Sequence, residues 1–322
     1  MRFFITGIGG FAGAHLADHL LAAGHDVDGL VSRASGHPRL QALSGRYPRF
    51  DPARLACADI TDGSALAWAL AQFAPQGVFH LAGITFVPRA GADVARTMAV
   101  NALGTLRLLE AVQESAPAAR VLVVSSAEAY GAVPPDALPV TEEVPLRPIS
   151  VYGLSKAAAD MAAFQQWWQT GLAVIRVRAF NHTGPGQGPE FACSDFARQL
   201  ARIERDQTPP ELHVGSLAAV RDFSDVRDIV RGYALLLERG VPGEAYNLCS
   251  GTGTSLAVIV EHLRAMCRVR VGVVEDRGRL RGREVPTLVG TAARAEALGW
   301  SPAIPIQQTL GDLLEHWRYE VA

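Results

Sequence analysis

The 322-residue chain has little of several features that mark other classes of protein. Its four cysteines, Cys57, Cys193, Cys249 and Cys267, form no Cys-x-x-Cys pair, so we expect free thiols in the reducing cytoplasm. No apolar run approaches the roughly 18 residues of a membrane span, so we expect no membrane anchor. Because Met1 leads directly into a predicted strand, we also expect no cleaved leader. The net charge of −2 argues against a general nucleic-acid or membrane-surface role.

Metal-binding patterns and internal repeats are also missing. His15 and His19 stand one helical turn apart, but no acidic residue follows His15 as in zinc proteases, so we expect surface histidines and no bound metal. We find no repeat, low-complexity tract or linker. The 49% hydrophobic and 19% charged residues indicate instead a globular chain of one large or two smaller domains with a substantial core.

A strand, a glycine-rich loop and a helix open the chain. Residues 2–5 are mostly apolar and predict a short strand. The loop TGIGGFAG at 6–13 then places Gly7, Gly10 and Gly13 three residues apart, before a helix with an apolar face. Backbone amides and a helix N-terminus in this context can hold a pyrophosphate. The spacing differs from the commoner Gly-x-Gly-x-x-Gly, so the interpretation depends on the order of strand, loop and helix.

A second group of residues indicates acid–base chemistry. An apolar run predicts a buried parallel strand that ends at Ser126, with Glu128 two residues further on. Tyr152 and Lys156 are four residues apart, which places both on one face of a helix expected over about 155–168. A phenol titrates near pH ~10 and serves as an acid or base at neutrality only where a neighbour stabilises the phenolate. Taken alone, the spacing also fits a structural tyrosine beside a solvated lysine.

Together, the two groups resemble the extended short-chain dehydrogenase/reductase superfamily, with its TGxxGFxG loop and Ser–Tyr–Lys triad. The resemblance implies an α/β fold, a Rossmann-type doubly wound parallel sheet with a smaller, intertwined C-terminal lobe. It also implies that Tyr152 exchanges a proton with the substrate and that Ser126 hydrogen-bonds the reacting oxygen. Lys156 would bind the nicotinamide ribose and lower the pKa of Tyr152.

The same resemblance implies which residues hold the cofactor. The second predicted strand ends at Val31, where NAD-binding folds usually carry a carboxylate, and Ser32 and Arg33 follow. A hydroxyl and a guanidinium suit a 2′-phosphate better than a 2′-hydroxyl, so we expect NADP(H). The expected cofactor-binding residues are Gly7, Gly10, Phe11, Gly13, Ser32, Arg33, Asp59, Ile60, Leu81, Ala82, Gly83, Asn101, Tyr152 and Lys156.

Downstream stretches narrow the resemblance to the GDP-mannose dehydratase and GDP-4-keto-6-deoxymannose reductase group. These stretches are RAFNHTGPGQ at 178–187, SDFARQ at 194–199, VRDFSDVRD at 220–228 and LRGREVP at 280–286. The last departs from the familiar LRPxEVP by one glycine. The resemblance implies a GDP-linked 4-keto-6-deoxy sugar as substrate, its diphosphate held by guanidinium groups, which recognise phosphate well. The expected substrate-binding residues are Asn181, Arg198, Arg221, Arg281 and Glu284.

Alternating strand and helix patterns divide the chain into two parts. We expect an NADP-binding Rossmann domain over 1–180 together with about 219–250. A nucleotide-sugar-binding lobe would comprise 181–218 and 251–322. The resemblance further implies a homodimer, formed by a four-helix contact between two copies of the chain.

We interpret the chain as an NADPH-dependent reductase of the C4 keto group of GDP-4-dehydro-6-deoxy-D-mannose, giving GDP-D-rhamnose, with Tyr152 as proton donor. GDP-mannose 4,6-dehydratase is the alternative, because Glu128 stands where that enzyme's elimination carboxylate would be. Against it, Ala127 lacks the polar group that many dehydratases carry there. A nucleotide-sugar 4-epimerase is less favoured. A non-catalytic NADP-sensing protein is also less favoured, because sensors often lose the Tyr or the Lys. The configuration at C4 depends on pocket shape, which the sequence does not fix.

Overall fold

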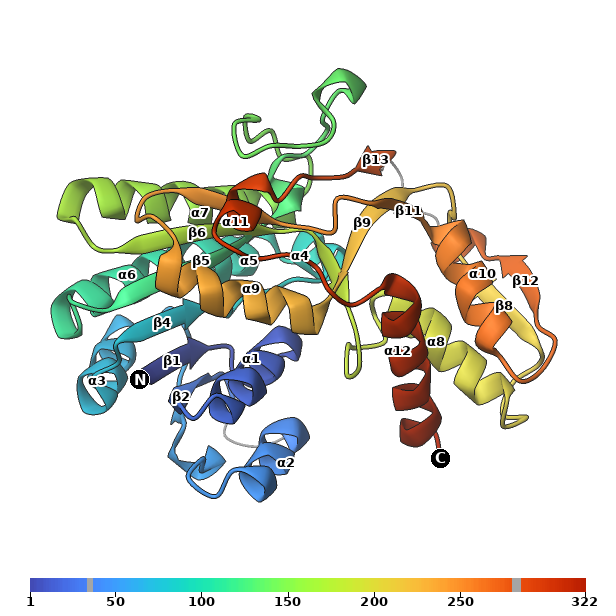
Figure 1. Ribbon diagram of the computed structural model, residues 1–322, viewed down its shortest axis with the longest axis horizontal. Coiled ribbons are helices and arrows are strands. Elements are labelled where there is room, and N and C mark those ends of the chain that lie inside the picture. The colour runs from blue at the N-terminus through green and yellow to red at the C-terminus, as the bar shows by residue number, and fades with distance from the viewer. Residues whose placement is uncertain (34–36, 280–284) are drawn as a thin grey trace.

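Seven parallel strands form the main sheet of the computed structural model, which describes residues 1–33, 37–279 and 285–322. The strands lie in the order β10-β6-β5-β4-β1-β2-β3 (Figure 1). Their bounds are β1 Arg2–Thr6, β2 Asp26–Val31, β3 Ala56–Cys57, β4 Gly77–His80, β5 Arg120–Ser126, β6 Val174–Ala179 and β10 Ala245–Leu248. The winding reverses between β1 and β4, and ligands of such sheets bind at this reversal, beyond the carboxyl ends of the strands. The predicted doubly wound sheet is confirmed.

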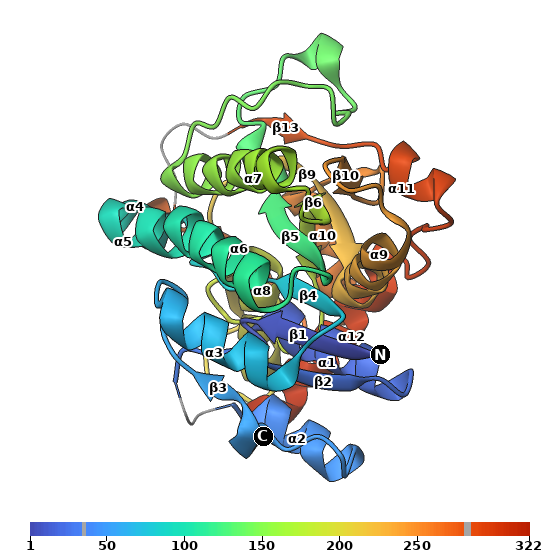
Figure 2. The same ribbon diagram turned by 90° about the vertical axis from the view of Figure 1, so that its left-hand side faces the viewer.

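Helices cover both faces of this sheet. Figure 2 shows α3, α6 and α7 on one face and α1 and α9 on the other. The helices are α1 Phe11–Ala22, α2 Pro38–Arg46, α3 Gly63–Phe73, α4 Val87–Ala92, α5 Val94–Met98, α6 Gly104–Ser115, α7 Val151–Thr170, α8 Ala192–Ile203, α9 Val226–Arg239, α10 Leu256–Met266, α11 Ala293–Ala297 and α12 Ile306–Glu320. A π-helical turn, Ala99–Leu103, joins α5 to α6. Among the described residues, no helix is long and apolar enough to cross a membrane.

Strand side chains alternate between two apolar cores. Phe3 and Ile5 of β1 pack in the core that also contains residues of α1 and α9, whereas Phe4 packs in the core that contains residues of α3 and α6. Successive side chains of a strand point to opposite faces, and here both faces are covered by helices. Central strands such as β5 therefore contain a continuous apolar run, which marked that strand in the sequence.

A smaller lobe accompanies the main sheet. It contains the strand path β11-β9-β13 with β7 paired to β9, and the strand pair β12-β8. The bounds are β7 Asn181–Thr183, β8 Glu211–Val214, β9 Val220–Asp225, β11 Gly253–Ser255, β12 Gly272–Glu275 and β13 Thr287–Leu288. Residues of α8, α10 and α12 form a third apolar core with β8. This lobe therefore has hydrophobic support of its own.

The division of the chain expected from the sequence stays a prediction. Within 219–250, β10 lies in the main sheet and α9 packs on α1, but β9 lies in the smaller sheet. Trp300, from the segment 251–322, packs in the same core as α9. The chain therefore passes between the two parts more often than the three expected boundaries would allow.

Helix α7 begins at Val151, earlier than the expected start near residue 155. The hydroxyl of Ser150 accepts a hydrogen bond from the backbone N–H of Gly153 at 3.0 Å, which satisfies one of the N–H groups that a helix start leaves unpaired. Tyr152 therefore lies in the first turn of α7, and Lys156 follows one turn later on the same face.

Candidate active site

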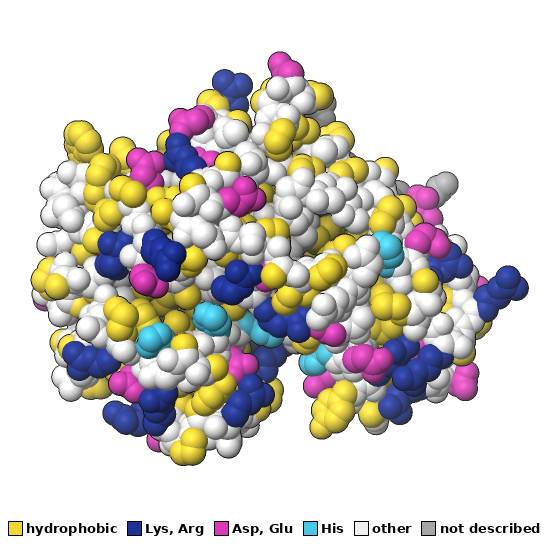
Figure 3. Space-filling model, in the orientation of Figure 1, with side chains coloured by type: hydrophobic (Ala, Val, Ile, Leu, Met, Phe, Trp, Pro, Cys, Tyr) yellow, Lys and Arg dark blue, Asp and Glu magenta, His cyan; other side chains and the backbone are white. Residues whose placement is uncertain are grey.

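A cavity of about 1630 Å³ lies between the carboxyl ends of the main strands and the smaller lobe. A pocket for one small molecule has roughly 300–1,000 Å³, so this cavity has room for two ligands. Figure 3 shows one face of the molecule notched between its two parts, with histidine side chains along the junction. The predicted site residues that line the cavity are Gly7, Gly10, Phe11, Gly13, Ser32, Arg33, Asp59, Ile60, Leu81, Ala82, Gly83, Ser126, Glu128, Tyr152, Lys156, Asn181, Arg198 and Arg221.

The glycine-rich loop joins β1 to α1 along this cavity. Gly7 has a φ of +71°, and a Cβ at Gly13 would lie 2.2 Å from the Gly7 carbonyl oxygen, so both positions require glycine. Helix α1 starts after Gly10 without a side-chain hydrogen bond to its first turn. The backbone N–H groups of such a turn attract an anion. The loop and the first turn therefore fit the pyrophosphate of a dinucleotide.

The end of β2 carries a hydroxyl and a guanidinium at the place where NAD-binding folds usually have a carboxylate. Ser32 and Arg33 follow Val31; both are exposed and both line the cavity. The Nε2 atom of His37 lies 2.9 Å from the Arg33 carbonyl oxygen, and the His37 ring lies against Gly9. The sequence analysis missed His37, because the polar stretch around it has no strand or helix pattern that would place it.

Asp59 lines the cavity beyond β3 as an ionised group. Hydrogen bonds from the Arg96 guanidinium and from the N–H and hydroxyl of Thr61 lower the pKa of Asp59 to about 2. Arg96 also lines the cavity. The two partners are 37 residues apart in the sequence, so sequence analysis did not predict the pair. Together, the Asp59 carboxylate and the Arg96 guanidinium offer a hydrogen-bond acceptor and hydrogen-bond donors to a polar ring of a bound ligand.

Ser126, Tyr152 and Lys156 meet at the carboxyl end of β5. The pKa of Tyr152 is raised to about 12, chiefly by burial and also by the Glu128 carboxylate, against a hydrogen bond with Ser126 that lowers it. Burial lowers the pKa of Lys156 to about 8, and its ammonium donates to the Val124 carbonyl at 2.7 Å. Burial dominates here, so the pKa of Tyr152 is raised and the net lowering expected from Lys156 is not found. Tyr152 is a protonated phenol at neutral pH.

Close packing at the start of α7 brings these groups together. A Cβ at Gly153 would lie 2.4 Å from the Glu128 carbonyl oxygen, so a larger residue would push α7 away from β5. Asn101 holds α7 from the π-helical turn: its amide donates to the Ser155 hydroxyl at 2.8 Å and to the Ile84 carbonyl at 2.9 Å. Asn101 is buried and is not among the described residues that line the cavity, so its expected contact with the cofactor stays a prediction. Its observed bonds position the cavity wall.

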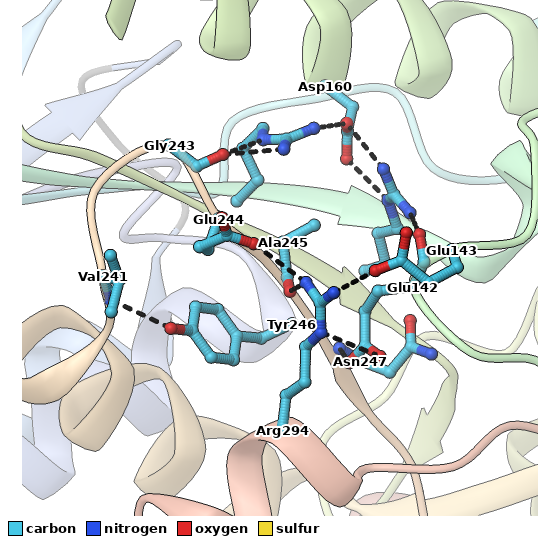
Figure 4. A network of polar contacts seen from close by, with 12 residues as sticks. Glu142, Glu143, Asp160, Val241, Gly243, Glu244, Ala245, Tyr246, Asn247 and Arg294 are labelled. Carbon is cyan, nitrogen blue, oxygen red and sulfur yellow. Dashed lines mark hydrogen bonds and ion pairs between the residues drawn. The ribbon is translucent and has the colours of Figure 1, made fainter.

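A buried ionic network fastens the next turn of α7 to the sheet (Figure 4). Asp160, four residues after Lys156, accepts hydrogen bonds from Arg176 at 2.6 Å and from Arg178 at 2.9 and 3.1 Å. Arg178 also donates to the Tyr130 hydroxyl at 3.1 Å. Because the Asp160 carboxylate is fully buried, it depends on these guanidinium groups to compensate its charge. The network therefore fixes the orientation of the helix that carries Tyr152 and Lys156.

The predicted substrate-binding residues that the structure describes lie on the smaller-lobe side of the cavity. Asn181 opens β7, Arg198 lies on α8 and Arg221 lies on β9. Arg281 and Glu284 lie outside the described residues. Within residues 1–33, 37–279 and 285–322, no group of three or more His, Cys, Asp or Glu side chains could hold a metal ion. Asn181, Arg198 and Arg221 therefore bring amide and guanidinium donors to this side of the cavity.

The fold and the geometry of the site place the chain among the extended short-chain dehydrogenases/reductases, which are NAD(P)-dependent oxidoreductases. Within that class, the sequence profile described as GDP-mannose 4,6 dehydratase matches residues 4–313, and the chain belongs to this family.

One relative and two solved structures match almost the whole chain. The chain is 36% identical over 321 residues to GDP-6-deoxy-D-mannose reductase of Pseudomonas aeruginosa. This match covers 99% of the chain and 98% of the relative. The structure of RMD from Pseudomonas aeruginosa complexed with NADPH gives a TM-score of 0.85 at 34% identity over 99% of each chain. UDP-glucose 4-epimerase of Thermus thermophilus, solved with NAD, gives a TM-score of 0.85 at 25% identity over 99% of each chain. Similar structures thus include complexes with either cofactor.

Proposed function

We propose that the chain is an NADPH-dependent reductase of the C4 keto group of GDP-4-dehydro-6-deoxy-D-mannose, with GDP-D-rhamnose as product. The observation that carries the proposal is the Tyr152 phenol, hydrogen-bonded to Ser126 at a cavity with room for a cofactor and a nucleotide sugar. A phenol that keeps its proton at neutral pH can supply that proton to a ketone oxygen during reduction. Similarity to a GDP-6-deoxy-D-mannose reductase over 99% of the chain supports the substrate class.

Residues at the ends of β1 and β2 fit the cofactor. The glycine-rich loop and the first turn of α1 would hold its pyrophosphate, and Ser32 and Arg33 would bind the 2′-phosphate, because a guanidinium favours a doubly charged phosphate. Lys156 would bind the nicotinamide ribose. When bound, NADPH supplies the hydride for the ketone. These residues support NADP(H) as the cofactor.

Tyr152 and Ser126 would act on the substrate oxygen. The Ser126 hydroxyl donates a hydrogen bond to the C4 carbonyl, and Tyr152 gives its proton to the same oxygen as negative charge develops there. The raised pKa of Tyr152 keeps the proton in place until that moment. Lys156, one turn further along α7, then stabilises the phenolate that remains, since a nearby ammonium favours the charged form. Asn181, Arg198 and Arg221 would hold the sugar and its diphosphate.

We extend the proposal to a cytoplasmic homodimer formed through α6 and α7. Leu154, Met161, Phe164 and Trp168 of α7 are exposed apolar side chains, and Trp168 is 75% exposed. Contiguous apolar surface of this kind marks a protein interface. The four cysteines are free thiols, in keeping with a reducing compartment. Light scattering that gives the mass of one chain would contradict the dimer.

Glu128 favours a second candidate, GDP-mannose 4,6-dehydratase. Its carboxylate lines the cavity, is half-buried and contributes to raising the pKa of Tyr152. A carboxylate at this place can remove the C5 proton of a 4-keto sugar, whereas reduction at C4 requires no base at C5. The Glu128 side chain therefore separates the two functions.

Two incubations test the proposal. With the 4-keto sugar and NADPH, the reductase should consume NADPH and form a 6-deoxy sugar whose C4 configuration nuclear magnetic resonance can assign. Glu128→Gln should reduce that rate far less than Tyr152→Phe does. With GDP-mannose in deuterated water, a dehydratase should incorporate deuterium at C5. Robust C5 exchange in the unaltered protein, lost in Glu128→Gln, would overturn the reductase in favour of the dehydratase.

A further inference from the structure

A nearly buried carboxylate organises two arginines on the smaller-lobe wall of the cavity. Asp195, in the first turn of α8, accepts hydrogen bonds from Arg198 Nη2 at 3.1 Å and from Arg279 Nη1 at 2.5 Å. Gln199 donates to the same carboxylate at 2.7 Å. Only 10% of the Asp195 side chain is exposed, although Asp195 and both arginines line the cavity.

Gln199 holds the Asp195 carboxylate in place from the side of strand β8. Its side-chain oxygen accepts from the His213 N–H at 2.9 Å, and its side-chain nitrogen donates to the His213 carbonyl at 3.0 Å. The amide is thereby clamped to strand β8, and its donation to Asp195 fixes the carboxylate in one orientation. A carboxylate held in this way determines where two otherwise flexible guanidinium groups lie, which lowers the entropy lost when they bind a ligand.

The two arginines also reach the cavity. The exposed fractions of the Arg198 and Arg279 side chains are 35% and 40%. Each guanidinium carries five N–H donors in a planar fork, and Asp195 engages one terminal nitrogen of each. The Nε of Arg198 is buried without a hydrogen-bond partner among the described residues. Two adjacent guanidinium groups suit paired phosphates, because each can bond two oxygens of a phosphate at once.

We propose that Arg279 and Arg198 bind the diphosphate of the nucleotide-sugar substrate and that Asp195 is the residue that positions them. The inference rests on the proposed function, and it adds Arg279, which no sequence motif singled out. Charge alone predicts the opposite role for Asp195: a carboxylate beside a diphosphate repels it, so removing the carboxylate should strengthen binding. Positioning and charge therefore give effects of opposite sign, and an experiment can separate them.

The test measures the binding of GDP, guanosine and NADPH to Arg279→Gln and Asp195→Asn by calorimetry. Arg279→Gln should raise the dissociation constant of GDP by at least about tenfold, the loss expected for one charge-assisted hydrogen bond. Guanosine lacks the phosphates, so its binding should change less than about twofold. NADPH binding should also persist, which shows that the variant is folded. Arg202→Gln is the matched control, because Arg202 is an exposed arginine on the same helix and outside the described lining of the cavity.

Each outcome decides part of the proposal. Unchanged GDP binding in Arg279→Gln, or an equal loss for guanosine, overturns the diphosphate site. Asp195→Asn should weaken GDP binding by several-fold while leaving guanosine unchanged, and tighter GDP binding would overturn its positioning role. In turnover, both variants should raise KM for the 4-keto sugar more than they lower kcat. A protein that binds GDP through Arg279 but never oxidises NADPH with the 4-keto sugar would refute the proposed function and leave the phosphate site standing.

Discussion

The Lys156 ammonium donates a hydrogen bond to the Val124 carbonyl oxygen at 2.7 Å. The Ser125 hydroxyl returns one to the Lys156 carbonyl at 3.0 Å, so helix α7 and strand β5 are joined in both directions. Ser126 follows on that strand, and Tyr152 lies one turn before Lys156 on that helix. The relation between the serine and the tyrosine is therefore set by backbone elements that are locked together.

Tyr152→Phe should separate proton donation from cofactor binding. General acid catalysis typically contributes about 10²–10⁴-fold, so ketone reduction should fall by about that factor. NADPH affinity should change little, because we propose that the glycine-rich loop, Arg33 and Lys156 hold the cofactor. The measurements are turnover with the 4-keto sugar and NADPH binding by fluorescence. A variant that retains more than a tenth of the activity would show that another group protonates the C4 oxygen.

Arg33→Ala should weaken the preference for NADPH. We expect the unaltered protein to bind NADPH at least about tenfold more tightly than NADH, since a charge-assisted bond to the 2′-phosphate favours it by about 1.5–3 kcal/mol. The variant should bring the two dissociation constants closer together, mainly by raising that of NADPH. Arg54→Ala, an exposed arginine outside the described cavity lining, is the control. Equal constants in the unaltered protein would contradict the assignment.

Asp160→Asn should destabilise the fold far more than the loss of a surface ion pair. The change leaves Arg176 and Arg178 without their buried counter-charge, and breaking such a pair costs about 3–5 kcal/mol. Asp18→Asn removes the partner of the largely exposed Arg46 and should cost less than about 1 kcal/mol. Urea unfolding of both variants measures the two free energies. Similar losses would mean that the buried network contributes no more than a surface contact.

Acid should destabilise the protein through its buried histidines, His80 above all. Burial, with a smaller effect from Lys156, lowers the pKa of His80 to about 3. Below about pH 6.5 the unfolded chain binds a proton that the folded protein does not, so stability falls by about 1.4 kcal/mol per pH unit until about pH 3. His80→Asn should flatten the decline of the melting temperature between pH 7 and pH 5. The exposed His213→Asn should leave it unchanged, and equal slopes in His80→Asn and the unaltered protein would contradict the assignment.

Local sequence patterns were sufficient to predict the structure of segments whose conformation depends only on their own residues. The glycine-rich loop needs small residues at Gly7 and Gly13 because the backbone turns back on itself there, and this need is visible in the sequence. The four-residue interval from Tyr152 to Lys156 likewise fixes a shared helical face. The start of α7 was misplaced because Ser150, its capping residue, lies within a polar, proline-rich stretch that indicates a loop.

The sequence by itself determined the order of strands and helices, the glycine-rich loop and the helical spacing of the acid–base pair, because each depends on neighbours within a few residues. Only the tertiary structure decided what depends on distant segments. Arg279 reaches Asp195 across 84 positions of sequence, and the Phe11 ring at the start of α1 stacks on His182, with ring centroids 6.2 Å apart. The same holds for the pKa of Tyr152, which burial raises to about 12. Burial is a property of the packed chain, so no local pattern could have predicted that the pKa of Tyr152 is raised.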